Sequence, residues 1–157
     1  MLTYRVLKML KKILTVSLLG ATLAFVGCQS LPSSSQSNQA QLQNKTWVAT
    51  KIGNAALITN PSERNITSLQ FDEATKRVTG SDGCNRLTGS FEAGKNTISF
   101  SQVASTRMAC LNNSNVDQLF NKALAQVTHY KVEGKTLSLL DAQGTAVIQF
   151  ESAIQPR

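Results

Sequence analysis

Cys84 and Cys110 are the side chains of this sequence best suited to chemistry. Each lies in a short motif, Gly-Cys-Asn-Arg-x-x-Gly at 83–89 and Thr-Arg-Met-Ala-Cys at 106–110. The chain begins with an export signal, described below, and thiols in an oxidising compartment tend to pair. We expect a disulfide, which would close a loop of about 27 residues and stabilise the fold by about 3–4 kcal/mol. Two buried free thiols, or redox or metal chemistry, are the alternatives.

Other reactive arrangements lack their usual motifs. A structural zinc site needs four ligands, and one histidine with two available cysteines does not supply the usual sets. The sequence contains neither Cys-x-x-Cys nor Gly-x-Ser-x-Gly. His129 lies where a helix is expected to give way to a strand, and we interpret it as a helix-end partner or a surface group. We therefore predict no catalytic residue, no metal, no cofactor and no enzymatic activity.

The residues beside the two cysteines are the candidate contacts for a partner or ligand. They are Asn85, Arg86 and Arg107. Each also has a structural interpretation: Asn85 can adopt a left-handed turn and hydrogen-bond to local backbone, and Arg86 can pair with Asp82 or another acid. Met108 is expected to fill the core rather than to bind a partner.

The N-terminus resembles a bacterial lipoprotein signal. All charged residues before Cys28 are basic and lie ahead of an apolar run at 13–26; they are Arg5, Lys8, Lys11 and Lys12. The apolar run is too short to span a bilayer comfortably. Residues 25–28, Phe-Val-Gly-Cys, resemble a lipobox with Phe in place of the usual Leu. We expect cleavage after residue 27 and lipidation of Cys28, with plain secretion or an uncleaved anchor as alternatives. An Asp after the lipidated cysteine often signals retention in the inner membrane of enteric bacteria, but residue 29 is Gln. We therefore expect the protein to be anchored in the outer membrane, facing the periplasm.

Removal of residues 1–27 changes the charge balance. The whole chain carries +7, but these residues hold four of the sixteen basic side chains and none of the nine acidic ones, which leaves +3. Without a basic run, and with 6% aromatic residues, the chain is not expected to bind nucleic acid. Residues 28–44 are rich in Ser, Gln and Asn, and we interpret them as a flexible tether.

The elements that must position the motifs are mostly strands. Alternation of apolar and polar residues with intervening turns predicts antiparallel strands near 46–52, 66–71, 77–80, 87–91, 97–100, 129–133, 136–141 and 145–150. Between the strands 97–100 and 129–133 the period becomes helical, and we predict an amphipathic helix over 115–127 that begins at Ser114 or Asn115. Leu119, Phe120 and Leu124 are expected on its apolar face. The fold class is therefore mainly β (α+β).

The two cysteine motifs at this spacing, with Trp47 near the start, resemble the META domain of the HslJ-like heat-shock lipoproteins. We assign this domain to 45–152. The resemblance implies a strongly curved antiparallel sheet approaching a small barrel, with one helix packed on it. It implies no established enzymatic activity, and it leads us to expect an association with the cell envelope and with stress.

The function that we expect is that of a lipid-anchored, non-enzymatic binding or interaction module. Its partners would be the membrane, through the anchor, and an unknown envelope protein. The alternative is a carrier that holds a small apolar ligand in a barrel-like cavity. The size of the internal cavity distinguishes the interaction module from the carrier, because a carrier needs an empty interior of a few hundred cubic ångströms.

Overall fold

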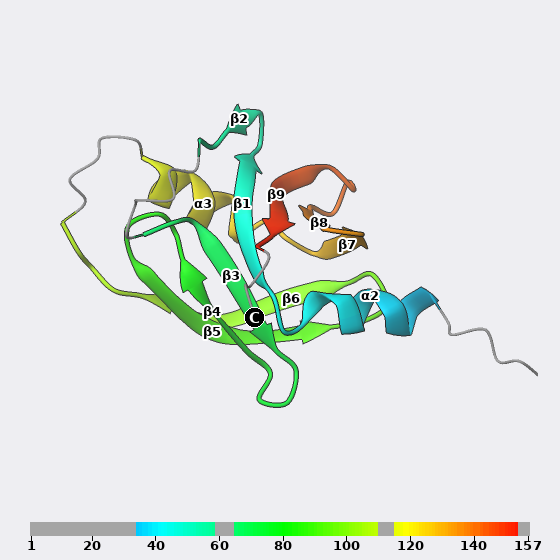
Figure 1. Ribbon diagram of the computed structural model, residues 1–157. Helices are drawn as coiled ribbons and strands as arrows, with labels where there is room; N and C mark the ends of the chain where they lie inside the picture. Colours follow the sequence, from blue (N-terminus) through cyan, green and yellow to red (C-terminus); the bar gives the residue numbers. More distant parts are fainter. Residues whose placement is uncertain (1–33, 59–64, 110–114, 154–157) are drawn as a thin grey trace, which may run out of the picture. The chain divides into compact units, whose positions relative to one another are not determined.

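The computed structural model describes residues 34–58, 65–109 and 115–153 (Figure 1). The predicted signal, Cys28 and Cys110 lie outside the described residues. The helices and strands are α2 (Ser34–Leu42), β1 (Thr46–Ile52), β2 (Ala55–Ala56), β3 (Ser68–Asp72), β4 (Arg77–Ser81), β5 (Arg86–Ala93), β6 (Ile98–Ser105), α3 (Val116–Leu124), β7 (His129–Glu133), β8 (Thr136–Leu140) and β9 (Ala146–Ser152).

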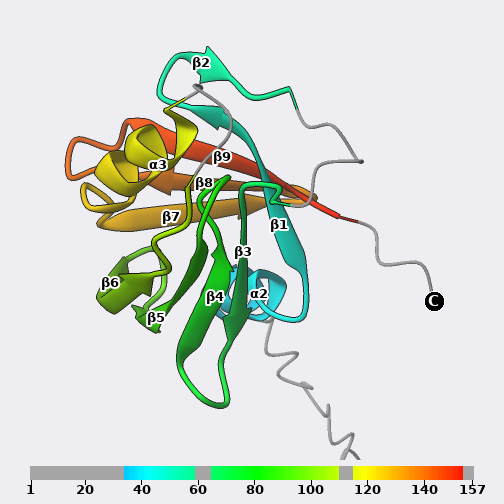
Figure 2. The same ribbon diagram turned by 90° about the vertical axis from the view of Figure 1, so that its left-hand side faces the viewer.

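The strands form one antiparallel sheet in the order β6-β5-β4-β3-β1-β9-β8-β7, with β2 paired to β1. The sheet curls strongly into a half-barrel, as Figures 1 and 2 show. Its two outer strands, β6 and β7, approach each other at one end, where Ile98 N donates to Thr128 O at 3.0 Å and Tyr130 N donates to Asn96 O at 2.8 Å. The Tyr130 hydroxyl also donates to Gly94 O at 3.0 Å. The predicted fold class is confirmed.

The inner face of the curled sheet carries the core, because every second strand residue points inward. Trp47, Phe91, Leu137, Leu139 and Phe150 are fully buried there. The Phe71 and Phe91 rings meet edge to face at 5.1 Å, and the Phe120 and Phe150 rings do so at 6.4 Å. Large side chains therefore occupy the interior between the sheet and α3.

A close approach between β3 and β4 requires a glycine at position 80, three residues before the first cysteine motif. A Cβ atom on Gly80 would lie 1.9 Å from the main-chain oxygen of Ser68 on the paired strand. Only glycine fits there, so β3 and β4 can approach closely at the point where the loop with the first cysteine begins.

Helix α3 packs over one end of the half-barrel, against β9 and β1 (Figure 2). Phe120 is fully buried, and Ala123 and Leu124 are buried beside it. The expectation for Leu119 is wrong, because 46% of this residue is exposed. The helix begins after Asn115, which has a left-handed φ of 48° and makes no side-chain capping bond. Ser114, the other predicted cap, lies outside the described residues.

The predicted tether is partly wrong, because nine of its residues, 34–42, form a helix. Residues 34–42 form α2, and Leu42 is fully buried. The Trp47 indole N–H donates to the Leu42 carbonyl oxygen at 2.8 Å. The helix also contacts β7. The packed part of the chain therefore begins before residue 45, because one apolar residue and one buried hydrogen bond hold the end of α2 on the domain.

Candidate functional site

The loop between β4 and β5 is organised around a buried carboxylate. Asp82 is fully buried, and its Oδ1 accepts hydrogen bonds from Cys84 N at 3.0 Å and from Asn85 N at 2.6 Å. Its Oδ2 accepts from Asn85 Nδ2 at 3.3 Å and from Asn121 Nδ2 of α3 at 3.0 Å. The expected pairing of Asp82 with Arg86 is wrong: amide groups of the loop and of α3 satisfy the carboxylate, and Arg86 points outward.

Asn85 joins the two cysteine motifs. It is 9% exposed, and its Oδ1 accepts a hydrogen bond from Met108 N at 2.9 Å while its Nδ2 donates to Asp82. The left-handed residue of this loop is Gly83, with φ +99°, and not Asn85. Because protein groups hold both ends of the amide, Asn85 is a structural link here and does not offer its side chain to a ligand.

Cys84 lies against the second motif. Its Sγ is 3.8 Å from the Met108 carbonyl oxygen, and its own carbonyl oxygen accepts from Asn65 Nδ2 at 3.0 Å. Cys84 is disulfide-bonded, with a partner outside the described residues. The pairing with Cys110 stays a prediction, which the approach of Cys84 to a residue two positions before Cys110 supports.

The other residues singled out from the sequence lie at the surface. Arg86 and Arg107 are exposed. Met108 was expected in the core, but 54% of it is exposed, so that expectation is wrong. His129 begins β7, and its Nδ1 lies 2.8 Å from the Thr128 hydroxyl. Of these residues, only Arg86 lines the surface groove described next.

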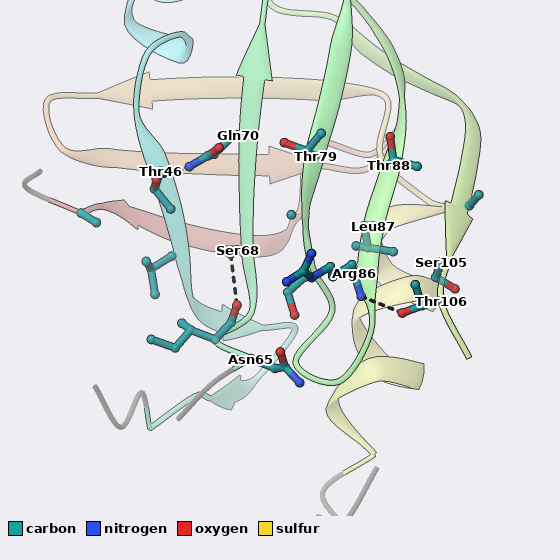
Figure 3. Close-up of a pocket in the computed structure, with 16 residues that line it drawn as sticks. Thr46, Asn65, Ser68, Gln70, Thr79, Arg86, Leu87, Thr88, Ser105 and Thr106 are labelled. Atoms are coloured by element: carbon teal, nitrogen blue, oxygen red, sulfur yellow. Dashed lines mark hydrogen bonds between the residues drawn. The ribbon is translucent and has the colours of Figure 1, made fainter. Parts of the chain in front are cut away.

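The outer face of the sheet carries an open groove of about 980 Å³ over β1, β3, β4, β5 and β6 (Figure 3). Two rows of residues run across these strands, because paired residues on neighbouring strands share a face. The first row is Thr46, Gln70, Thr79, Thr88 and Ala104. The second row is Val48, Ser68, Ser81 and Arg86, continued by Thr106, whose hydroxyl accepts from Arg86 N at 3.1 Å. We call these the first row and the second row of the outer-face groove.

Arg86 supplies the charge of this groove. Its side chain points into the groove over β4 (Figure 3), and it is the one charged residue among the described residues that line the groove. Within the described part of the chain, the guanidinium has no ion pair or hydrogen bond. Arg77 lies on the same face one row further along and donates to the Thr88 hydroxyl at 3.0 Å. The groove therefore offers hydroxyl and amide groups beside an available cation.

The sequence contains a signal for this groove that was not used. Thr46, Ser68, Gln70, Thr79 and Thr88 all occupy the polar positions of alternating strands. Such positions normally face solvent, so their types alone do not separate a binding surface from an ordinary outer face. Only the pairing register places them side by side.

In residues 34–58, 65–109 and 115–153, no group of three or more His, Cys, Asp and Glu side chains is placed to hold a metal ion. Over the same ranges, no helix has both the length and the apolar character needed to cross a bilayer.

The described part of the chain is a half-barrel of antiparallel strands with a Gly-Cys-Asn-Arg sequence at 83–86, where β4 passes to β5. The chain belongs to the META domain family, whose model matches residues 40–154. The match begins within α2, in agreement with the packing of Leu42.

Two solved structures share the fold. The NMR structure of a protein from Burkholderia xenovorans is 21% identical with a TM-score of 0.60, over 78% of this chain and 88% of that chain. A second NMR structure is 23% identical with a TM-score of 0.56, over 71% of this chain and 92% of that chain. At these identities the likeness concerns the fold alone. No curated protein sequence matches the chain significantly.

Proposed function

We propose that this META-domain chain is a lipid-anchored protein of the bacterial outer membrane, facing the periplasm, that acts as a non-enzymatic binding module in envelope stress. The outer-face groove is its binding surface. The observation that carries the proposal is the exposed Arg86 in a groove of about 980 Å³ whose other polar groups are hydroxyls and amides. These groups suit hydrogen bonding to a polar partner.

The filled interior favours this surface over the alternative of a carrier. A carrier of a small apolar ligand needs an enclosed apolar space. Here the rings of Phe71, Phe91, Phe120 and Phe150 pack edge to face inside the half-barrel. The outer-face groove instead is open and carries hydroxyl, amide and guanidinium groups among its apolar lining, so we place the partner on the outside of the sheet.

The anchor part of the proposal rests on the basic N-terminus, the apolar run 13–26 and the lipobox-like residues before Cys28. The test is Cys28→Ser in a bacterial host, with palmitate labelling and membrane fractionation. Wild type should incorporate palmitate and sediment with outer membranes, and the variant should do neither. A variant that stays processed and membrane-bound would exclude lipidation at this cysteine.

The binding part is tested by photocrosslinking in cells. A photoreactive residue is placed at Thr79, in the first row, and in a second strain at Lys131, which is exposed on β7 outside the groove. We expect a discrete adduct at Thr79 that Arg86→Gln reduces, and no such adduct at Lys131. Equal adducts at both positions, or none at Thr79, would contradict a binding role for this face.

A further inference from the structure

We infer that the outer-face groove binds an extended acidic glycan, laid across the strands, with a carboxylate of the glycan on Arg86. This inference rests on the proposed function, because it names the ligand of the same groove. Three observations carry it: the two rows run across the strands, the lining has a positive charge, and the main-chain groups of the groove strands are already hydrogen-bonded to neighbouring strands.

The rows determine the shape of the ligand. Neighbouring strands lie about 4.8 Å apart, so the first row, from Thr46 on β1 to Ala104 on β6, spans about 19 Å in four steps. Each of the first four positions offers a hydroxyl or an amide, and Figure 3 shows Thr46, Gln70, Thr79 and Thr88 following one another across the sheet. A chain of sugar rings presents hydroxyl groups at comparable steps. The ligand is therefore linear and rich in hydroxyls.

The charge of the lining determines the sign of the ligand. Arg86 stands in the second row with an available guanidinium. No Asp or Glu is among the described residues that line the groove. A guanidinium binds a carboxylate through two parallel hydrogen bonds. The ligand therefore carries carboxylates along its length.

The strand backbones exclude a peptide that binds by strand addition. An extended peptide recognises a sheet through unpaired main-chain groups at an edge. In the groove, β3, β4 and β5 each pair with a strand on both sides, so only their side chains are available. Single-stranded nucleic acid needs aromatic platforms, and the described lining residues include no aromatic side chain. A glycan fits what remains.

The test is a titration of the full chain in detergent micelles, followed by calorimetry and by ¹H–¹⁵N NMR shifts. The probes are tetragalacturonic acid, its methyl ester, which has the same sugar chain without charge, and tetraglutamate. The variants are Arg86→Gln, Thr79→Val, which keeps a β-branched side chain on the exposed strand, and Arg107→Gln as the matched control. Arg107 was a candidate contact on sequence grounds, but it is exposed and does not line the groove, so this variant separates binding in the groove from binding to any exposed arginine.

We expect tetragalacturonic acid to shift the amides of Thr79 and Thr88 and to bind at least tenfold more tightly than its ester. Arg86→Gln should weaken binding about ten- to hundredfold, the range for one hydrogen-bonded charge. Thr79→Val should weaken it severalfold, and Arg107→Gln should leave it within twofold. The ratio between the acid and its ester should fall as salt is added.

Two results would overturn the inference. Tetraglutamate that binds as tightly with the same shifts would make the ligand an acidic peptide. No groove shift with tetragalacturonic acid, or an equal loss in Arg86→Gln and Arg107→Gln, would remove the glycan from this site. In either case an adduct at Thr79 in cells would still support the binding role, so the two failures can be told apart.

Discussion

Replacing Asp82 with alanine tests whether one buried carboxylate organises the loop between β4 and β5. The change removes Oδ1, the single atom that accepts hydrogen bonds from the main-chain N–H groups of Cys84, at 3.0 Å, and Asn85, at 2.6 Å. It also removes the partner of Asn121 on α3, at 3.0 Å. A buried donor left without a partner costs about 1–3 kcal/mol. With two such donors and the lost link to α3, we expect Asp82→Ala to lower the free energy of unfolding by about 3–5 kcal/mol.

A matched control has the same local chemistry outside the core. Asp141 Oδ1 accepts from Gln143 N at 2.9 Å and from Thr145 N at 2.8 Å in an exposed turn. Water can replace these bonds, so Asp141→Ala should cost only about 0.5–1.5 kcal/mol. Equilibrium urea unfolding followed by fluorescence measures both, because Trp47 is the one tryptophan of the chain and is fully buried. Equal losses in the two variants would refute the argument that burial makes Asp82 decisive.

Three further predictions concern the helix, the cysteines and pH. Phe120→Ala should cost about 3–5 kcal/mol of stability, whereas Leu119→Ala, at a residue that is 46% exposed, should cost under about 1 kcal/mol; similar losses in urea unfolding would contradict the packing of α3. Reduction, or replacement of both Cys84 and Cys110 by Ser, should lower the melting temperature, and an unchanged value would argue against their pairing. Hydrogen bonds from the side chain and backbone of Thr75, and from the backbone of Ala74, lower the pKa of Asp72 below its usual 3.8. The stabilising contribution of the Asp72 carboxylate is therefore present above pH 3.8 and is lost as the pH falls through the lower pKa of the folded state. A pKa at or above 3.8 for Asp72 in an NMR titration would contradict this.

The sequence predicted the strands and α3 well because their patterns are local. The alternation of apolar and polar residues along β3, β4 and β8 indicates which residues face inward, and the spacing of Phe120, Ala123 and Leu124 indicates a helix. Leu119 misled the prediction because an apolar residue at the border of a helical stripe does not reveal whether the sheet reaches it.

These errors share a cause, which is contacts that no local pattern of residues reveals. Helix α2 has a polar composition, and it is held by Leu42 and by a hydrogen bond from Trp47 that no periodicity announces. Asp82 was paired with its neighbour Arg86, but its partner on α3 lies 39 positions away. The outer-face groove likewise depends on the register of five strands, and a shift of one residue would turn its hydroxyls inward.

The buried end of α2 also determines where a mechanical force on the N-terminal side of this domain is transmitted. Force applied at Ser34 would pass through Leu42 and the Trp47 indole bond directly into β1. That strand is not at an edge: it is held by β3 on one side and by β9 on the other. Releasing this strand would therefore require breaking its hydrogen bonds to two neighbouring strands. A pull on this end is therefore borne by an inner strand of the sheet and not by one of its edges.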